Sequence, residues 1–465
     1  MNTEYDAFLA SKTRTHIASG FHDDCEDSPM FPFQRATVRW ALDLGRAAIF
    51  ADTGLGKTLM QLEWASRVAR HTSGPVLLLA PLAVVRQTER EAQKFGITGV
   101  RVIDGMGDVD GPGVYVINYD AMHKIDPSVF VGVVLDESSI LKNVQGRTRR
   151  KLVADYAQTP YKLACTATPS PNDHTELGNH SEFLGVMDEA IMRARWFIND
   201  LGDTVQPWRL KRHAEGDFWR WVSSWARCIG KPSDMGDFSD EGYNLPPLEM
   251  TRHNVDVDIS QDRGDGMLFR VPELSATSIH AEKRRTAEDR AWAVADLVRS
   301  EPDEDWVVWC ETNYEQDAVM EVLTNAIDVR GNHKPADKAR DLLRFTDEGG
   351  IIVTKPKIAG MGLNWQHCAR MVFVGGSYSY EGFYQSVRRC YRFGQTRPVH
   401  AHVVMAKTET PMWHAIHRKS AQHERMKEKM YAASRKAAQR HSNTTAYKPN
   451  HNARIPAWLH TETNR

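Results

Sequence analysis

The chain has 465 residues, which at roughly 150 residues per domain indicates about three domains or two large ones. Its content of 41% hydrophobic and 26% charged residues is ordinary for a folded protein and excludes a wholly disordered or low-complexity chain. The formal net charge is −1, but the segment from Arg418 onward carries eleven Lys or Arg against three Glu. Such a basic tail on an acidic body is typical both of nucleic-acid contact and of solvated disorder.

Two further classes are excluded by pattern. The sequence holds no run of 18 apolar residues and no apolar core near its first residues, so we expect neither a membrane span nor a secretion signal. Its six cysteines are scattered without C-x-x-C spacing, which argues against a zinc site or a disulfide framework. We therefore expect a protein of the reducing cytoplasm.

Short apolar runs alternate with helical stretches through the first half of the chain. Strands are expected at residues 47–51, 76–80, 114–118, 131–135 and 161–166, with a helix over 58–70. Strand and helix in alternation predict an open parallel sheet, so residues 1–187 form a first α/β lobe. Residues 188–245 are rich in tryptophan and show no strand signal, which predicts a helical insertion that packs its own aromatic rings and ends in a linker. The alternative is that one of these rings stacks on a nucleic-acid base.

The alternation resumes after the linker. Strands are expected at residues 306–310, 351–354, 371–375 and 401–405, with helices over 287–299 and 315–327. Residues 246–418 therefore form a second α/β lobe, and residues 419–465 form a basic tail that is helical at first and then unpatterned. The predicted fold class is α/β, with two parallel-sheet lobes, a helical insertion after the first lobe and a basic C-terminal tail.

The strongest motif is A-D-T-G-L-G-K-T at residues 51–58, which follows an expected strand and opens an expected helix. This is the context of a phosphate-binding loop, although alanine holds the first glycine position. The backbone at Thr53, Gly54 and Gly56 can approach phosphate oxygens. Lys57 would neutralise the β- and γ-phosphates, and the Thr58 hydroxyl would bind Mg²⁺. The sequence thus predicts a site for ATP and Mg²⁺.

A second acidic element completes this prediction. The apolar run V-V-L at residues 133–135 ends in Asp136 and Glu137. Asp136 would hold the Mg²⁺, and Glu137 would polarise the water that attacks the γ-phosphate. Acidic residues at the end of a strand are also common helix caps. The pair therefore indicates a nucleotide site only together with the phosphate-binding loop that precedes it.

With these elements the chain resembles helicase superfamily two, and within it the Swi/Snf-like ATPases, over nearly its whole length. F-Q at residues 33–34 is similar to the element in which a glutamine, here Gln34, reads adenine. The segments at residues 80–82 and 166–169 resemble elements that couple the ATP state to the nucleic-acid track. That likeness implies coupling roles for Pro81, Thr166 and Thr168. D-E-S-S with K-N at residues 136–143 matches the Swi/Snf form, except that Ser139 replaces a histidine.

The second half carries further matches. G-M-G-L-N at residues 360–364 resembles an element that faces the nucleotide cleft through Gly362 and the nucleic-acid backbone through Gly360 and Asn364. Q-S-V-R-R-C-Y-R-F-G-Q at residues 385–395 closely resembles the arginine element of the family; we keep that name for this segment.

The resemblance assigns Gln385 to the nucleotide and makes Arg389 and Arg392 arginine fingers on the γ-phosphate. The two arginines lie three residues apart, so we expect them on one face of a helix.

The resemblance implies two RecA-like lobes that close on ATP and act on DNA. A double-stranded DNA translocase is the expected function, with duplex DNA as the partner. Strand separation by a DNA or RNA helicase is the first alternative. An ATP-gated scaffold that does not hydrolyse ATP and recruits replication or recombination proteins is the second. The region from residue 208 to 248 is similar to an insertion of compact, phage-encoded members, which would place the protein in a bacterial host cytoplasm.

Overall fold

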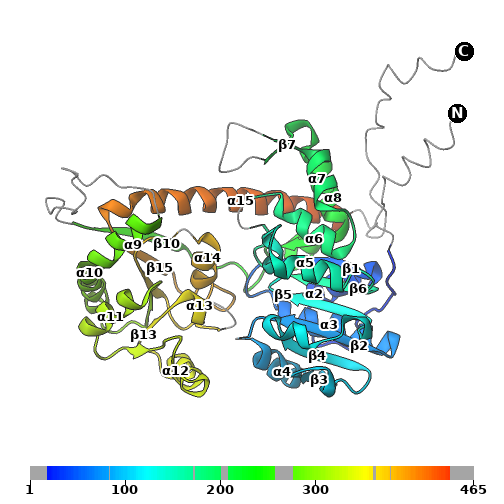
Figure 1. Cartoon of the computed structure of the whole chain (residues 1–465), viewed down its shortest axis with the longest axis horizontal. Coiled ribbons are helices and arrows are strands. Elements are labelled where there is room, and N and C mark those ends of the chain that lie inside the picture. Colours follow the sequence, from blue (N-terminus) through cyan, green and yellow to red (C-terminus); the bar gives the residue numbers. More distant parts are fainter. Residues whose placement is uncertain are drawn as a thin grey trace, which may run out of the picture.

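The computed structural model describes residues 18–82, 84–170, 173–199, 208–256, 276–359, 363–377 and 379–439. Within these residues the chain forms two parallel sheets, each flanked by helices, and one long helix runs over both (Figure 1). The first sheet with its helices is called lobe 1, and the second is called lobe 2. This arrangement confirms the predicted fold class.

Lobe 1 contains seven strands, all paired in parallel. In spatial order they are β3 (Val100–Val102), β4 (Gly113–Asn118), β2 (Pro75–Ala80), β5 (Gly132–Asp136), β6 (Tyr161–Cys165), β1 (Arg46–Ala51) and β9 (Ala226–Ile229). The helices of this lobe are α2 (Pro32–Leu44), α3 (Lys57–Thr72), α4 (Val85–Lys94), α5 (Arg147–Asp155) and α6 (Glu176–Leu184). The five strands predicted here and the helix α3 are confirmed to within a residue or two at their ends.

Lobe 2 contains six strands, again all parallel. In spatial order they are β10 (Leu248–Val255), β15 (Val399–Ala406), β14 (Arg370–Val374), β11 (Trp306–Trp309), β13 (Ile351–Thr354) and β12 (Ile327–Asp328). The helices of this lobe are α9 (Ala276–Arg285), α10 (Ala287–Ser300), α11 (Asn313–Val322), α12 (Pro335–Glu348), α13 (Pro356–Ala359) and α14 (Tyr380–Val387).

One predicted helix of lobe 2 is too long. The helix expected over residues 315–327 ends at Val322, and β12 begins at Ile327, whose backbone pairs with Ile352 of β13. Because Ile327 also packs against the core of the lobe, apolar periodicity continued past the true end of the helix.

The insertion was predicted to hold no strand, and this prediction is wrong. It contains α7 (Glu189–Trp196), a short antiparallel pair of β7 (Phe197–Asn199) and β8 (Trp208–Leu210), and α8 (Glu215–Trp225). The strand β9 follows directly and extends the sheet of lobe 1 beside β1, with Ala226 opposite Ala48. A four-residue strand without alternation leaves no mark in the sequence, since its pairing partner lies far away along the chain.

Most of the aromatic rings of the insertion are buried, as predicted, but they do not form a separate core. Trp196 stacks on Trp221 with ring centroids 4.7 Å apart. Trp225 lies edge-on to Phe50 of β1, with centroids 6.1 Å apart. The insertion therefore packs into the apolar core of lobe 1.

The cores of the two lobes differ. Lobe 1 has one continuous apolar core that includes the insertion. Lobe 2 has two cores on opposite faces of its sheet, because Val307 and Trp309 of β11 enter one and Trp306 and Val308 enter the other. This alternation is the period of two that side chains follow along a strand.

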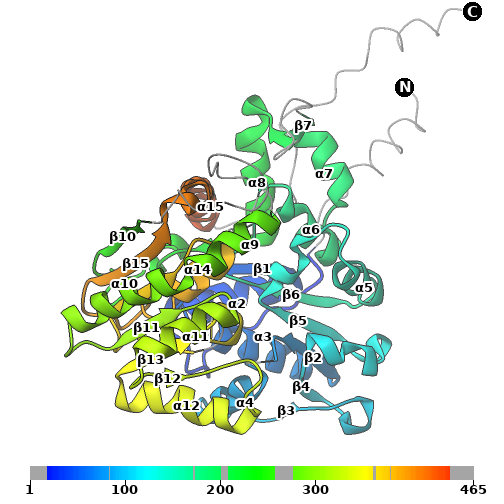
Figure 2. The same ribbon diagram turned by 60° about the vertical axis from the view of Figure 1, so that its left-hand side comes forward.

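The last helix, α15 (Thr410–Gln439), joins the two lobes. Its first half packs on lobe 2, where Ile416 belongs to the core, and its second half packs on lobe 1, where Met426 and Met430 belong to the core. Figure 2 shows α15 nearly end-on above both sheets. The sequence predicted a helix from about residue 419 within a tail; the helix begins nine residues earlier and is an integral part of both lobes, up to residue 439.

None of the helices in the described part of the chain is both long and apolar enough to cross a membrane.

Candidate functional site

Residues 52–56, which belong to the phosphate-binding loop predicted from the sequence, connect β1 to α3 at the carboxyl edge of the lobe 1 sheet. We call this segment the glycine loop or phosphate loop. Gly54 and Gly56 have φ values of 91° and 75°, in the left-handed region that glycine adopts without strain. Gly56 is the residue that caps the N-terminus of α3. The loop thus turns backbone N–H groups of the helix start toward the space in front of the sheet, as phosphate binding requires.

Lys57 is the first residue of α3 and lies folded back over the loop. Its Nζ donates to the carbonyl oxygens of Ala51 at 2.9 Å and Asp52 at 3.2 Å. Burial lowers the pKa of Lys57, and the charges of Glu137, Asp52 and Asp136 oppose this shift. An anion next to this ammonium would restore the charged form that burial disfavours.

The two predicted carboxylates follow β5. Asp136 accepts a hydrogen bond from Nε2 of Gln61 at 2.8 Å, and Glu137 accepts one from the Thr166 hydroxyl at 3.1 Å. Burial raises the pKa of both carboxyls, while Lys57 lowers it. Glu137 has a φ of 54°, a left-handed conformation that costs about 1 kcal/mol or more for a residue with a β-carbon and that clusters at functional sites.

Thr166 and Thr168 lie at the end of β6, next to these carboxylates, and both are fully buried. The Thr166 hydroxyl contacts Glu137 and also accepts from the backbone N–H of Thr168 at 3.1 Å. This chain of contacts links the carboxylate to the segment that the resemblance assigns to nucleic-acid coupling.

Gln34 is buried in the first turn of α2 and points at the loop. Its Nε2 donates to the carbonyl of Leu55 at 2.8 Å, and its Oε1 accepts from the N–H of Phe31 at 2.9 Å. Gln34 therefore braces the loop in this structure. Thr58 lies half-buried in the first turn of α3, and Thr53 lies half-buried in the loop.

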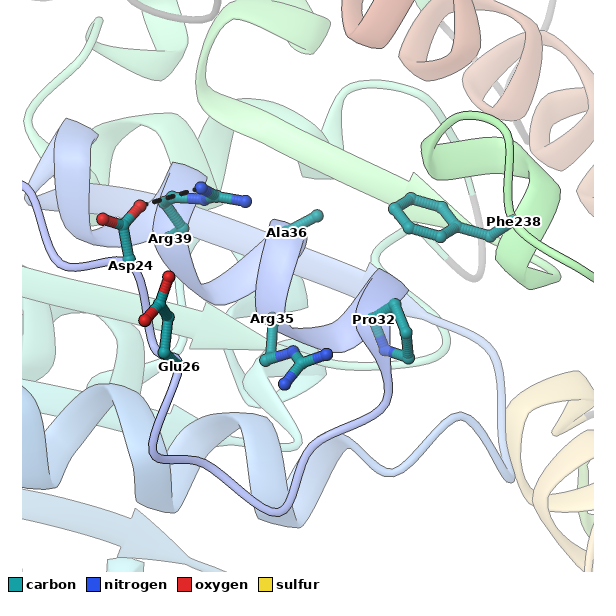
Figure 3. A pocket seen from close by; sticks show the side chains of 7 residues that line it. All are labelled: Asp24, Glu26, Pro32, Arg35, Ala36, Arg39 and Phe238. Atoms are coloured by element: carbon teal, nitrogen blue, oxygen red, sulfur yellow. Dashed lines mark hydrogen bonds and ion pairs between the residues drawn. The ribbon is translucent and has the colours of Figure 1, made fainter.

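An open pocket of about 500 Å³ lies beside the start of α2. Figure 3 shows acidic side chains on one side of α2 and an aromatic ring on the other, with an ion pair of 2.9 Å between Arg39 and Asp24. Its lining residues are Asp24, Glu26, Pro32, Arg35, Ala36, Arg39 and Phe238. None of the predicted site residues lines this pocket, although Gln34 lies in the same helical turn as Arg35.

Lobe 2 contributes the arginine element, and here one prediction is wrong. Arg389 and Arg392 do not share a helix face, because α14 ends at Val387 and the backbone carbonyl of Arg389 accepts from the N–H of Trp365 at 2.9 Å. The two side chains nevertheless converge. The Nη1 of each donates to the carbonyl of Leu363 at 3.0 Å.

The two arginines differ in burial, since Arg389 is buried and Arg392 is half-buried. Arg389 is 6% exposed, and burial together with the neighbouring charge of Arg392 lowers its pKa to about 10. The carboxylate of Glu137 in lobe 1 opposes this shift, which places the arginine charge within electrostatic reach of the lobe 1 carboxylate. Burial also lowers the pKa of Arg392.

The two lobes touch at the loop itself. A β-carbon added to Gly54 would lie 2.9 Å from the backbone nitrogen of Phe393, so lobe 2 approaches the loop too closely for any side chain at that position. Lys142, after the carboxylates, forms an ion pair with Glu381 of α14. The glycine loop, the carboxylates and the arginine element therefore meet at one place between the lobes.

The remaining residues predicted for the site differ in their exposure, and two of them are not described by the structure. Gly360 and Gly362 lie outside the described residues. Asn364 is exposed, and Pro81 is half-buried directly after β2. Gln385 is half-buried in the last turn of α14.

Several residues with contacts in this site were not predicted. Gln61 holds Asp136, as described above. Asp52 contacts Tyr384, Arg388 and Lys427, three residues of lobe 2 and α15. The acidic residue inside the loop was the only available signal in the sequence, since its partners lie more than 330 positions away.

The donor set fits a nucleoside triphosphate with Mg²⁺. Lys57 and the start of α3 offer positive charge for phosphates, and Thr58 and Asp136 offer the oxygen ligands that Mg²⁺ prefers. In the described part of the chain, no group of three or more His, Cys, Asp or Glu side chains is placed to hold a metal ion alone. A Mg²⁺ site commonly takes its other ligands from phosphate and water.

Comparisons with known proteins agree with the resemblance seen in the sequence. The chain is 23% identical over 427 residues to the SWI/SNF-related matrix-associated actin-dependent regulator of chromatin subfamily A-like protein 1 of Xenopus tropicalis. That match covers 84% of this chain and 44% of the relative. The chain is 28% identical over 197 residues to protein p41 of Acyrthosiphon pisum secondary endosymbiont phage 1, which covers 36% of this chain and 42% of that protein.

Among solved structures, the chain is similar to the Sulfolobus solfataricus SWI2/SNF2 ATPase core in complex with dsDNA. The TM-score is 0.41 at 14% identity, over 92% of this chain and 97% of that one. No protein-family model matches the chain. The chain spans less than half the length of the curated relatives described here. The predicted resemblance to Swi/Snf-like ATPases is confirmed by the SWI/SNF-related sequence relatives.

Proposed function

We propose that this Swi/Snf-like chain is a DNA-dependent ATPase, which hydrolyses ATP to ADP and phosphate and thereby moves along duplex DNA. One observation carries the proposal. The glycine loop and the carboxylates of lobe 1 meet the arginine element of lobe 2, with Phe393 against Gly54 and the charge of Arg389 within reach of Glu137. In a site divided in this way, ATP hydrolysis depends on the contact between the two lobes.

Lobe 1 supplies the binding groups. Lys57 now bonds to two loop carbonyls and has a pKa lowered by burial, so it gains most by turning to the phosphates of ATP. Thr58 and Asp136 would hold Mg²⁺, which when bound screens the phosphate charges and stabilises the leaving group. Gln34 keeps the loop in shape through the carbonyl of Leu55.

Glu137 and Arg389 supply the groups for the chemical step. Burial raises the pKa of Glu137, which brings a carboxylate closer to the basicity needed to orient and polarise the attacking water. Arg389 offers a planar cation for the charge that spreads over the phosphoryl oxygens in the transition state. Because Arg389 belongs to lobe 2, hydrolysis requires both lobes in contact.

Movement follows from the same requirement. Loss of the γ-phosphate removes the negative charge that attracts the arginines, so the lobes relax apart after each turnover. Nucleic acid bound across both lobes would be gripped by each in turn. Thr166 offers a route for this coupling, since it contacts both Glu137 and the backbone of Thr168. We expect contacts mainly to phosphates, with binding that weakens as salt rises.

The test is ATP hydrolysis by the full chain without nucleic acid and with single-stranded DNA, duplex DNA, forked DNA and RNA. We expect the largest stimulation with duplex DNA. We expect Lys57→Ala to reduce turnover by about a hundredfold or more, since it removes the cation at the phosphates. Full activity of Lys57→Ala would refute the site assignment.

The same panel separates the alternatives. Displacement of a strand from forked duplexes would indicate a strand-separating helicase, and strongest stimulation by RNA would indicate an RNA helicase. ATP binding without turnover under any condition would indicate a scaffold, and would contradict the proposal. A triplex-displacement assay on duplex DNA measures translocation directly.

A further inference from the structure

A carboxylate stands inside the proposed phosphate loop. Asp52 follows β1 and is the only charged residue in the loop before Lys57. Its side chain is 9% exposed. A carboxylate at this position would repel the phosphates of a nucleotide, because both carry negative charge in a site of low dielectric constant. The loop can serve a phosphate only if this charge is neutralised.

The contacts of Asp52 show how it is neutralised. Its Oδ2 accepts from Nη2 of Arg388 at 2.6 Å and from Nζ of Lys427 at 3.0 Å. Its Oδ1 accepts from the hydroxyl of Tyr384 at 2.5 Å and from the backbone N–H of Thr53 at 2.7 Å. Lys427 also donates to the Tyr384 hydroxyl at 3.1 Å. We call these four side chains, Asp52, Tyr384, Arg388 and Lys427, the loop clamp.

The loop clamp is buried and remains charged. The side chain of Lys427 is 6% exposed and that of Arg388 is 13% exposed. Burial alone would raise the pKa of Asp52, but Arg388 and Lys427 hold it well below its ordinary value. Asp52 in turn holds the pKa of Lys427 well above its ordinary value against burial. Removing Asp52 would leave the buried cations Arg388 and Lys427 without their shared carboxylate, which is costly.

Three separate parts of the fold meet in the loop clamp. Asp52 belongs to the loop of lobe 1. Tyr384 lies on α14 of lobe 2, and Arg388 directly precedes Arg389 in the arginine element. Lys427 lies on α15, 375 positions from Asp52, on the half of the helix that packs on lobe 1. Figure 1 shows that α15 runs over both lobes.

We propose that Asp52 and Lys427 are positioning residues. Lys427 and Arg388 neutralise the carboxylate of Asp52. Together with Tyr384, these residues hold the arginine element against the phosphate loop. The helix α15 is thereby part of the ATPase site, although it contributes no group to the reaction. This inference rests on the proposed function for its kinetic consequences.

The kinetic test compares two lysines of α15. Lys429 is half-exposed and pairs with Glu215 of α8, so Lys429→Met removes the same charge from the same helix without touching the loop. We expect Lys427→Met to lower kcat/KM for ATP about tenfold, with KM raised by the bare carboxylate and kcat lowered by the displaced arginine element. We expect Lys429→Met to stay within about twofold of wild type. Lys427→Arg should recover most of the loss.

A double-mutant cycle tests the contact itself. Asp52→Asn removes the charge that Lys427 neutralises, so the loss in kcat/KM from Lys427→Met should be clearly smaller in the Asp52→Asn background. Lys429→Met should show no such coupling to Asp52. Additive effects of Asp52→Asn and Lys427→Met, or equal kinetics for the two lysine variants, would overturn the inference.

A measurement without nucleotide separates this inference from the proposed function. We expect amide hydrogen exchange over residues 380–395 to become faster in Lys427→Met than in wild type or Lys429→Met. Should Lys427→Met fail to fold, Tyr384→Phe removes one hydroxyl from the loop clamp and should accelerate exchange in the same segment. Unchanged exchange in the folded variants would overturn the inference. An inactive wild type with the expected exchange pattern would instead refute only the ATPase.

Discussion

Lobe 1 and lobe 2 hold their site residues in different ways. In lobe 1 the catalytic candidates are tied to groups of the same lobe. Asp136 is bonded to Gln61, Glu137 to Thr166, and Lys57 to carbonyls of its own loop. The side chains predicted to bind the nucleotide and its Mg²⁺ are therefore held in place within lobe 1 itself.

Lobe 2 depends on its neighbour. Arg389 and Arg392 are anchored on one backbone carbonyl, that of Leu363, and lie beyond the end of α14. The adjacent Arg388 reaches across the interface to Asp52 of lobe 1. The position of the arginine element is therefore set in part by the other lobe and by α15. Under the proposed function, the difference predicts that turnover, but not the binding of ATP, depends on the contact of lobe 2 with lobe 1.

The largest expected effect comes from the lobe 2 arginine. We expect Arg389→Ala to lower kcat about 10³-fold, as for arginines that stabilise phosphoryl transfer, while the Kd for ATP changes only severalfold. Steady-state kinetics and equilibrium titration with a fluorescent ATP analogue measure the two quantities. Arg397, which is half-exposed and pairs with Glu304, provides a control at Arg397→Ala. A loss of binding equal to the loss of turnover would break the division between the lobes.

The next largest loss of kcat is expected for Glu137→Gln. The amide keeps the size of the side chain and still accepts from the Thr166 hydroxyl, but it cannot polarise water. We expect kcat to fall roughly 10²- to 10³-fold with ATP binding intact. Asp110→Asn, at an exposed carboxylate paired with Arg101, serves as the matched control. Near-normal turnover in Glu137→Gln would remove this residue from the mechanism.

An effect of intermediate size is expected on the stability of the fold at low pH. Burial lowers the pKa of His180 in lobe 1 to about 4, so below its ordinary pKa of 6.5 the unfolded chain binds a proton that the folded chain does not. Stability contributed by His180 is therefore present above pH 6.5 and is lost as pH falls toward 4, by about 2 kcal/mol at pH 5. Urea unfolding at pH 7 and pH 5, with and without His180→Gln, measures this loss.

His402 of lobe 2 should behave in the same direction. Burial and the neighbouring charge of His253 lower its pKa to about 4. Because His402 is only half-buried, we expect its contribution to be smaller than that of His180. If the transition of lobe 2 proved the more acid-sensitive of the two, this ranking would be wrong.

The smallest effect is expected at the ion pair between Lys142 and Glu381, which also bridges the lobes. Lys142 is 41% exposed, so the pair is screened by water and salt. We expect Lys142→Met to lower kcat only about two- to threefold at low salt and less at high salt. A loss as large as that of Arg389→Ala would show that this surface pair, rather than the buried loop clamp, controls closure.

Much of the fold could be predicted because its signals are local. Buried parallel strands are apolar at nearly every position, and the helix that follows the glycine loop carries an apolar stripe. The end of α11 was missed because Ile327 is apolar for a different reason, its place in a strand. The strand β9 was missed because four residues beside β1 have no periodicity of their own.

The residues of the candidate site were likewise predicted where the signal is local and missed where it is not. Lys57, Asp136 and Glu137 were predicted from motifs that follow strands, and the structure brings them together at the carboxyl edge of one sheet. Their assigned roles remain predictions. The helix face expected for Arg389 and Arg392 was wrong, since α14 ends at Val387 and the carbonyl of Arg389 accepts a backbone bond from Trp365 instead. Such a bond joins distant segments and has no sequence signature.

The amino-acid order alone determined the two α/β halves, the glycine turn and the residue types that suit phosphate chemistry, because each depends on neighbours a few positions apart. Only the tertiary structure decided where α15 lies and which charges neutralise Asp52. A buried carboxylate must find cations wherever the fold brings them, and Lys427 reaches it only because one helix packs on both lobes. Long-range placement of this kind follows from packing, which no local pattern records.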